Sequence, residues 1–124
     1  MNVVDSSGWL EYLADGSNAG FFVRAIQDPA KLIVPTLSIY EVFKRVLQQR
    51  DESEALRAIA VMLQGTVVDL TTAIALSAAR ISAEMRLPMA DSVILATTRA
   101  HDAVLWSQDA DFEGMAGVRY VPAT

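Results

Sequence analysis

The 124-residue sequence contains no cysteine and only one histidine, His101. Without cysteine the chain forms no disulfide, offers no thiolate nucleophile and cannot bind zinc through sulfur. A single histidine also excludes a histidine-rich metal site. His101 follows a helical stretch, and because a protonatable ring is favourable at the carboxyl end of a helix, we assign it a capping role. Any chemistry must therefore depend mainly on carboxylates and hydroxyl groups.

The sequence also lacks any run of eighteen apolar residues, and its amino terminus has no basic segment followed by an apolar block. Those features would mark a membrane helix or a secretory signal. We therefore expect a soluble, cytoplasmic protein with no membrane association. The length and the hydrophobic content of 52% are sufficient for one continuous core, which predicts a single domain over residues 1–124.

Positive charge is scarce in this chain. Ten basic and fifteen acidic side chains give a net charge of -5 and a pI of about 4.7. Proteins that bind nucleic acid usually carry a basic stripe, so this balance counts against a nucleic-acid partner. That objection fails only if the carboxylates gather around metal ions and the basic residues gather elsewhere.

Short apolar runs alternate with segments of helical periodicity along the whole chain. The runs predict strands at residues 2–5, 32–34, 67–70, 103–106 and 118–121. The periodic segments predict helices within residues 6–13, 21–26, 36–48, 53–63, 74–85 and 90–101. Because parallel strands need crossover connections, this order implies an α/β fold in which helices cover both faces of a mostly parallel sheet.

Five acidic residues lie where the predicted strands end or the predicted helices begin. Asp5 follows the first strand, Asp109 and Asp111 follow the fourth, and Glu41 and Asp91 lie near the beginnings of helices. In open parallel sheets, ligands bind beyond the carboxyl ends of the strands. We therefore expect carboxylates from distant parts of the sequence to converge at this edge of the sheet.

Convergent carboxylates indicate a site for a divalent cation. Two unit charges about 4 Å apart repel by roughly 4 kcal/mol at an effective dielectric constant of about 20, and a cation reverses the sign. Oxygen-only sites suit Mg²⁺ or Mn²⁺, which support phosphodiester cleavage without cysteine or histidine. Each acid also has an ordinary explanation: Asp5 or Asp91 as a helix cap, Glu41 as a solvated helix residue, and Asp109 or Asp111 as a turn residue.

Four sequence blocks, taken in order, resemble the PIN-domain family and, within it, the toxin subunits of VapBC-type toxin-antitoxin pairs. Residues 2–13 resemble the opening motif, residues 34–42 the second, residues 87–96 the third and residues 105–112 the closing motif. The resemblance covers nearly the whole chain. It implies a PIN-like three-layer α/β/α sandwich and a metal-dependent endoribonuclease that cleaves RNA by attack of a metal-activated water, leaving a 3′-hydroxyl.

The resemblance also implies roles for individual residues. The catalytic and metal-binding acids would be Asp5, Glu41, Asp91 and Asp109, with one or two Mg²⁺ or Mn²⁺ ions. Family members differ in which acid of the closing motif is present, so Asp111 is a further candidate ligand; we favour Asp109 because it lies nearer the strand. The hydroxyl groups expected to orient carboxylates or waters are those of Ser7, Ser38 and Ser107. Caps and turns explain these serines equally well.

Two partners follow from the same resemblance, an RNA substrate and a cognate VapB-type antitoxin. The basic residues that we expect to contact RNA are Lys44, Arg45 and Arg86. The helix pair over residues 36–63 is expected either to pack against a partner, to form a homodimer, or to belong to the core. Two alternatives remain open at this stage: a non-catalytic PIN-like binding protein and a phosphoacceptor signalling domain.

Overall fold

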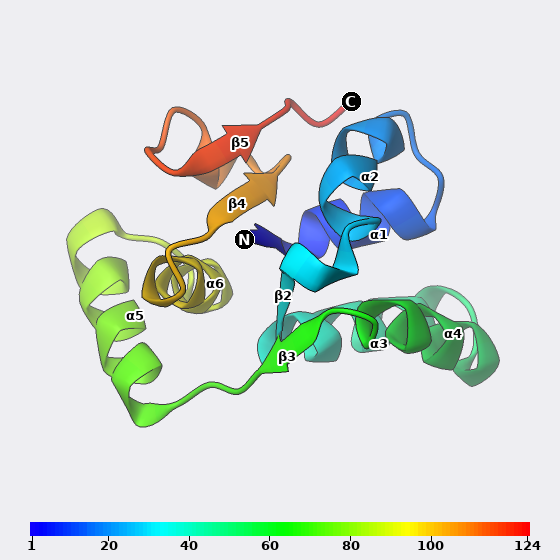
Figure 1. Ribbon diagram of the computed structural model, residues 1–124, viewed down its shortest axis with the longest axis horizontal. Helices are drawn as coiled ribbons and strands as arrows, with labels where there is room; N and C mark the ends of the chain where they lie inside the picture. The colour runs from blue at the N-terminus through cyan, green and yellow to red at the C-terminus, as the bar shows by residue number, and fades with distance from the viewer.

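The computed structural model describes residues 1–124, which form one five-stranded sheet between two layers of helices (Figure 1). The strands are β1 (Asn2–Val4), β2 (Leu32–Pro35), β3 (Thr66–Val68), β4 (Val104–Ser107) and β5 (Val118–Tyr120). Their order across the sheet is β3-β2-β1-β4-β5. Every neighbouring pair is parallel, which confirms the predicted α/β architecture.

Helices cover both faces of this sheet. One layer contains α1 (Ser6–Leu13), α2 (Ala19–Ile26), α3 (Thr36–Gln49) and α4 (Glu52–Met62), and the other contains α5 (Thr72–Met85) and α6 (Met89–Ala100). Adjacent residues of β1 supply both interfaces, because successive side chains of a strand point to opposite faces. Val4 belongs to the core beneath α1 to α4, whereas Val3 belongs to the core beneath α5 and α6.

Several helix ends are fixed by side-chain contacts. The Asp5 carboxylate accepts a hydrogen bond from the Gly8 amide at the start of α1, and the Thr71 hydroxyl accepts one from the Ile74 amide at the start of α5. At the end of α6, the Nδ1 atom of His101 lies 3.0 Å from the carbonyl oxygen of Thr97. The predicted capping role of the single histidine is therefore confirmed.

The strand order places a switch in chain direction between β1 and β4. The chain moves outward from β1 through β2 to β3, and then returns to the other side of β1 as β4. A crevice opens at such a point beyond the carboxyl ends of the strands. This order differs from the 2-1-3-4-5 order of flavodoxin-like phosphoacceptor domains, so the phosphoacceptor alternative is wrong.

Two short 3-10 helices complete the chain, η1 (Pro29–Lys31) and η2 (Ala110–Phe112). η2 follows β4 after a short turn that begins at Asp109. None of the helices combines the length and the apolar character that crossing a bilayer would require.

Candidate functional site

Asp5 is a buried carboxylate at the end of β1, with 2% of its surface exposed. It accepts hydrogen bonds from the Ser7 hydroxyl at 2.8 Å, from the Gly8 amide at 2.9 Å and from the Ser107 hydroxyl. A carboxylate has about four acceptor positions, so about one remains. Burial raises the pKa of Asp5 to about 6, although these three hydrogen bonds act in the opposite direction.

Three further carboxylates meet near Asp5, beyond the carboxyl end of β1. Asp91, Asp109 and Asp111 each offer an oxygen atom, and these atoms lie within 4.8 Å of one another. We call this group the aspartate cluster. Burial is the largest cause that raises the pKa of Asp91 to about 7, followed by the hydrogen bond with Asp111 and the negative charges of Asp109, Asp111 and Asp5. The cluster thus holds negative charge that no basic side chain neutralises.

Local structure explains how these acids are presented. Asp109 precedes η2 and accepts a hydrogen bond from the Asp111 amide at 2.9 Å, which is the turn geometry considered from the sequence. Asp91 lies inside the first turn of α6, where the cap position belongs to Pro88. The proposed cap role of Asp91 is therefore wrong. Asp109 and Asp111 both belong to the cluster.

Ser107 connects Asp5 to the aspartate cluster. It is the last residue of β4, is fully buried, and donates its hydroxyl to Asp5 while accepting the Asp109 amide at 2.9 Å. The register pairs Val4 with Trp106, which sets Asp5 beside Ser107 at the same edge of the sheet. Two adjacent parallel strands therefore fix the relative positions of Asp5 and Asp109.

Glu41 lies on α3 and is not part of the aspartate cluster. Its Oε1 atom accepts a hydrogen bond from the Ser6 hydroxyl at 2.5 Å, and no hydrogen bond reaches its other oxygen. Ser6 is the first residue of α1 and directly follows Asp5. The sequence analysis missed Ser6, although its position next to the first acid was a signal for it.

The other predicted site residues are two serines and three basic residues, and their contacts with the acids differ. Ser7 does contact Asp5, but the Ser38 hydroxyl is fully buried and has no hydrogen-bond partner. Lys44 and Arg45 are exposed on α3. Arg86 is exposed in the left-handed conformation (φ 56°) between α5 and α6, and no ion pair joins it to the acids. The only ion pair in the molecule joins Arg57 and Glu54.

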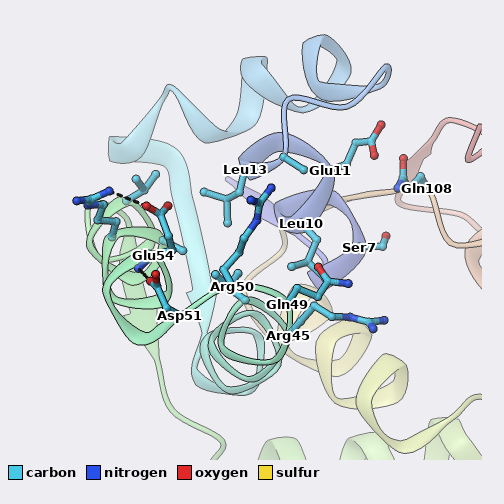
Figure 2. A pocket seen from close by; sticks show the side chains of 15 residues that line it. Ser7, Leu10, Glu11, Leu13, Arg45, Gln49, Arg50, Asp51, Glu54 and Gln108 are labelled. Carbon is cyan, nitrogen blue, oxygen red and sulfur yellow. Dashed lines mark hydrogen bonds and ion pairs between the residues drawn. The ribbon is translucent and has the colours of Figure 1, made fainter.

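Two hollows of the surface include a predicted site acid or residues that neighbour the site acids in sequence. The larger, of about 1130 Å³, lies between α1, α3 and α4 and includes Ser7 and Gln108, which neighbour the site residues in sequence. Figure 2 shows Arg50 reaching toward Leu10 and Leu13 of α1 in this groove. The smaller, of about 330 Å³, is lined by Tyr40, Glu41, Lys44, Arg45 and Gln48.

The donor set fits a hard divalent cation. Every candidate ligand is a carboxylate oxygen, and Mg²⁺ binds such oxygens at about 2.1 Å, which puts opposite ligands about 4.2 Å apart. The three oxygen atoms of the aspartate cluster lie within a comparable span. Burial is the largest cause of the raised pKa values of Asp5 and Asp91, and the neighbouring carboxylates raise them further, so a bound cation would favour the ionised forms.

The fold and the site define a parallel α/β/α protein with a carboxylate centre at the switch point of its sheet. The family model described as the PIN domain matches residues 3–118. The chain therefore belongs to the PIN-domain family, and the resemblance inferred from the four motifs is confirmed.

Solved structures with the same fold include a toxin-antitoxin complex, a toxin and a DNA-bound VapBC. A complex from Klebsiella pneumoniae has a TM-score of 0.81 at 19% identity, covering 96% of each chain. VapC20 from Mycobacterium tuberculosis, titled a sarcin-ricin loop cleaving toxin, has a TM-score of 0.77 at 18% identity, covering 94% of this chain and 95% of that one. DNA-bound VapBC from Salmonella typhimurium has a TM-score of 0.75 at 13% identity, covering 98% and 96%. A search of curated protein sequences finds no match.

Proposed function

We propose that this chain is a metal-dependent endoribonuclease and the toxin of a type II toxin-antitoxin pair. The observation that carries the proposal is the meeting of Asp91, Asp109 and Asp111 beside the buried Asp5, in a chain of the PIN-domain family. The structural relatives, which include a toxin-antitoxin complex and a toxin that cleaves the sarcin-ricin loop, support the same class of activity.

Some residues of the site would bind the cation directly, and others would hold these ligands in position. Asp91, Asp109 and Asp111 would bind one Mg²⁺ or Mn²⁺, with the remaining acceptor position of Asp5 and the unbonded oxygen of Glu41 as further ligands. When bound, such an ion activates the attacking water and neutralises charge that develops on the phosphate. Ser107 holds Asp5 and the Asp109 backbone in place, and Ser6 holds Glu41.

The substrate would approach over the basic residues of α3. Lys44 and Arg45 are exposed and form no ion pair, so their charges are available to phosphates. Arg86, exposed between α5 and α6, would be a further contact. These residues set affinity and register, whereas the chemistry depends on the carboxylates.

The large groove between α1, α3 and α4 is the surface that we assign to a VapB-type antitoxin. Its apolar wall includes Leu10, Leu13 and Val61, and its arginines include Arg50, which has no carboxylate partner. An amphipathic segment with an acidic side chain would match both features. Since the groove begins at Ser7 and Gln108, an antitoxin bound there would also reach the entrance of the site.

A homodimer is part of the same proposal. Leu47 on α3 and Leu56 on α4 are exposed, whereas Val46 and Ile59 pack against the core, so only part of the helix pair is available to a second copy. Sedimentation equilibrium of the purified chain, alone and with the product of the adjacent gene, measures both assemblies.

Cleavage of a randomised single-stranded RNA pool by the purified protein tests the activity. Wild type, Asp5→Asn and Asp91→Asn are compared with Mg²⁺, with Mn²⁺ and with chelator. We expect cation-dependent cleavage that falls at least about a hundredfold in both variants, because each removes a charged ligand. Asp69→Asn is the matched control, since Asp69 also follows a parallel strand but is exposed outside the site. Chelator-resistant cleavage, or equal cleavage by all four proteins, would contradict the proposal.

A further inference from the structure

The small hollow on α3, lined by Tyr40, Glu41, Lys44, Arg45 and Gln48, combines an aromatic ring with basic side chains. Residues three and four apart share one face of a helix, so these five form a continuous stripe on the exposed side of α3. We call it the Tyr40 hollow. It adjoins the catalytic acids through Glu41, which Ser6 ties to the residue after Asp5.

Tyr40 is unusually exposed for a large aromatic residue, at 60% of its surface. The Lys44 Nζ atom lies 5.8 Å from the centre of its ring, within the range of a cation-π contact. Neither Lys44 nor Arg45 has a carboxylate within ion-pair distance. In a chain of net charge -5, these two cations form a local positive patch that carboxylates have not neutralised.

We propose that the Tyr40 hollow binds one unpaired nucleotide of the RNA strand, adjacent to the phosphodiester that is cleaved. The base stacks on the Tyr40 ring, and the phosphate is bound by Lys44 and Arg45. This assignment rests on the proposed ribonuclease function and names the residues that would hold the RNA strand beside the site. A paired base is already stacked in its helix, so an exposed ring with neighbouring cations selects a base that is splayed out.

Binding without cleavage is measured first, in chelator. A fluorescein-labelled single-stranded RNA of randomised sequence is titrated with wild type, Tyr40→Ala and Tyr40→Phe, and binding is followed by fluorescence anisotropy. We expect Tyr40→Ala to weaken binding about fivefold or more, and Tyr40→Phe to stay within about twofold, because the ring supplies the stacking. A duplex of the same length should not distinguish Tyr40→Ala from wild type.

The control variant is Leu76→Ala, which removes an apolar side chain that is 63% exposed on α5, outside the hollow and the site. It should bind RNA as wild type does. Thermal melts of all variants should coincide, since neither Tyr40 nor Leu76 is buried. Equal single-strand binding by wild type and Tyr40→Ala would overturn the proposal. So would a loss of antitoxin binding in Tyr40→Ala with unchanged RNA binding, which would assign the hollow to a protein partner.

Cleavage kinetics separate this proposal from the function on which it rests. If wild type cleaves the pool, Tyr40→Ala should raise KM about fivefold or more while kcat stays unchanged, because the ring binds substrate away from the reacting atoms. If wild type cleaves nothing but Tyr40→Ala still weakens single-strand binding, the nucleotide site stands and the ribonuclease proposal is wrong. If wild type cleaves and both constants are unchanged in Tyr40→Ala, the ribonuclease stands and the nucleotide site is wrong.

Discussion

The aspartate cluster and the Tyr40 hollow differ in charge and in burial. The cluster gathers carboxylates around Asp91, whose pKa burial and neighbouring negative charges raise to about 7. The hollow presents Lys44 and Arg45 on an exposed helix face beside an exposed tyrosine. One region is therefore suited to hold a cation, and the other to hold an anion.

This difference shows why the overall charge of the chain does not by itself exclude a nucleic-acid partner. A net charge of -5 argues against nucleic-acid binding only when the charges are evenly mixed. Here part of the negative charge is concentrated where a cation would neutralise it, and Lys44 and Arg45 on α3 have no ion-pair partners. The local distribution of charge, rather than the sum, bears on function.

Among substitutions that leave every carboxylate in place, removing the Ser107 hydroxyl, which joins Asp5 to the aspartate cluster, should have the largest effect. Ser107→Ala deletes the hydrogen bond to Asp5 and the acceptor of the Asp109 amide, so we expect activity or metal affinity to fall about 10- to 100-fold. Because the Ser107 hydrogen bond lowers the pKa of Asp5, its loss should also move the pH profile of Mn²⁺ binding upward. Titration calorimetry at several pH values measures both effects.

Ser53→Ala is the matched control for this variant, since Ser53 is an exposed serine on α4 with no side-chain hydrogen bond. It should bind Mn²⁺ as wild type does. An unchanged pH profile in Ser107→Ala would show that Asp5 is held by the other two hydrogen bonds alone.

The stability of the cation-free protein should fall as pH rises toward neutrality. Between the ordinary pKa of 3.8 and the raised values of about 6 for Asp5 and 7 for Asp91, the folded state binds more protons than the unfolded chain. The free energy of unfolding therefore decreases as pH rises through this window. We expect the Tm in chelator to be roughly 5 °C lower at pH 7.5 than at pH 5.

Two additions sharpen this measurement. Mg²⁺ or Mn²⁺ at pH 7.5 should restore the Tm, because an ion that binds only the folded state stabilises it. Asp91→Asn should flatten the pH dependence, since it removes the carboxyl with the larger shift. A Tm in chelator that rises from pH 5 to pH 7.5 would mean that the carboxylates are not under repulsion.

Loss of the link between α1 and Glu41 should have a smaller effect. Ser6→Ala removes the donor to one Glu41 oxygen at a half-buried position, so we expect kcat to fall about 2- to 10-fold. Ser6→Thr retains the hydroxyl and should restore most of the rate, whereas a purely structural defect would lower the Tm of both variants. Single-turnover cleavage and thermal melts distinguish these outcomes.

Much of the fold followed from the sequence because burial has a clear period in this chain. Val3 and Val4 belong to opposite cores. The apolar runs at residues 2–5 and 103–106 place the first and fourth strands within one residue of β1 (Asn2–Val4) and β4 (Val104–Ser107). The third strand was less exact: it was predicted at residues 67–70, but Leu70 is exposed and pairing ends at Val68. Pairing registers depend on neighbouring strands, which local patterns do not report.

The site was predictable as a set of acids but not as a set of contacts. Asp91 and Asp109 were identified from their positions, whereas the bond from Ser6 to Glu41 depends on how α1 and α3 pack. Conversely, Ser38 was expected to orient a ligand, yet its hydroxyl is buried without a partner. Sequence order indicates which elements reach the site, and the rotation of each helix decides which side chain points into it.

The smallest expected effect concerns the basic residues of the Tyr40 hollow. Each lysine that contacts a phosphate of a single strand contributes about 0.7 to the slope of log affinity against log salt concentration. Lys44→Ala should therefore weaken RNA binding a few-fold at low salt and reduce that slope by about 0.7. Lys31→Ala is the matched control, because Lys31 is the only other lysine and precedes β2, at the opposite edge of the sheet. It changes the net charge equally, so an equal loss of slope in both variants would show that RNA responds to overall charge rather than to the α3 face.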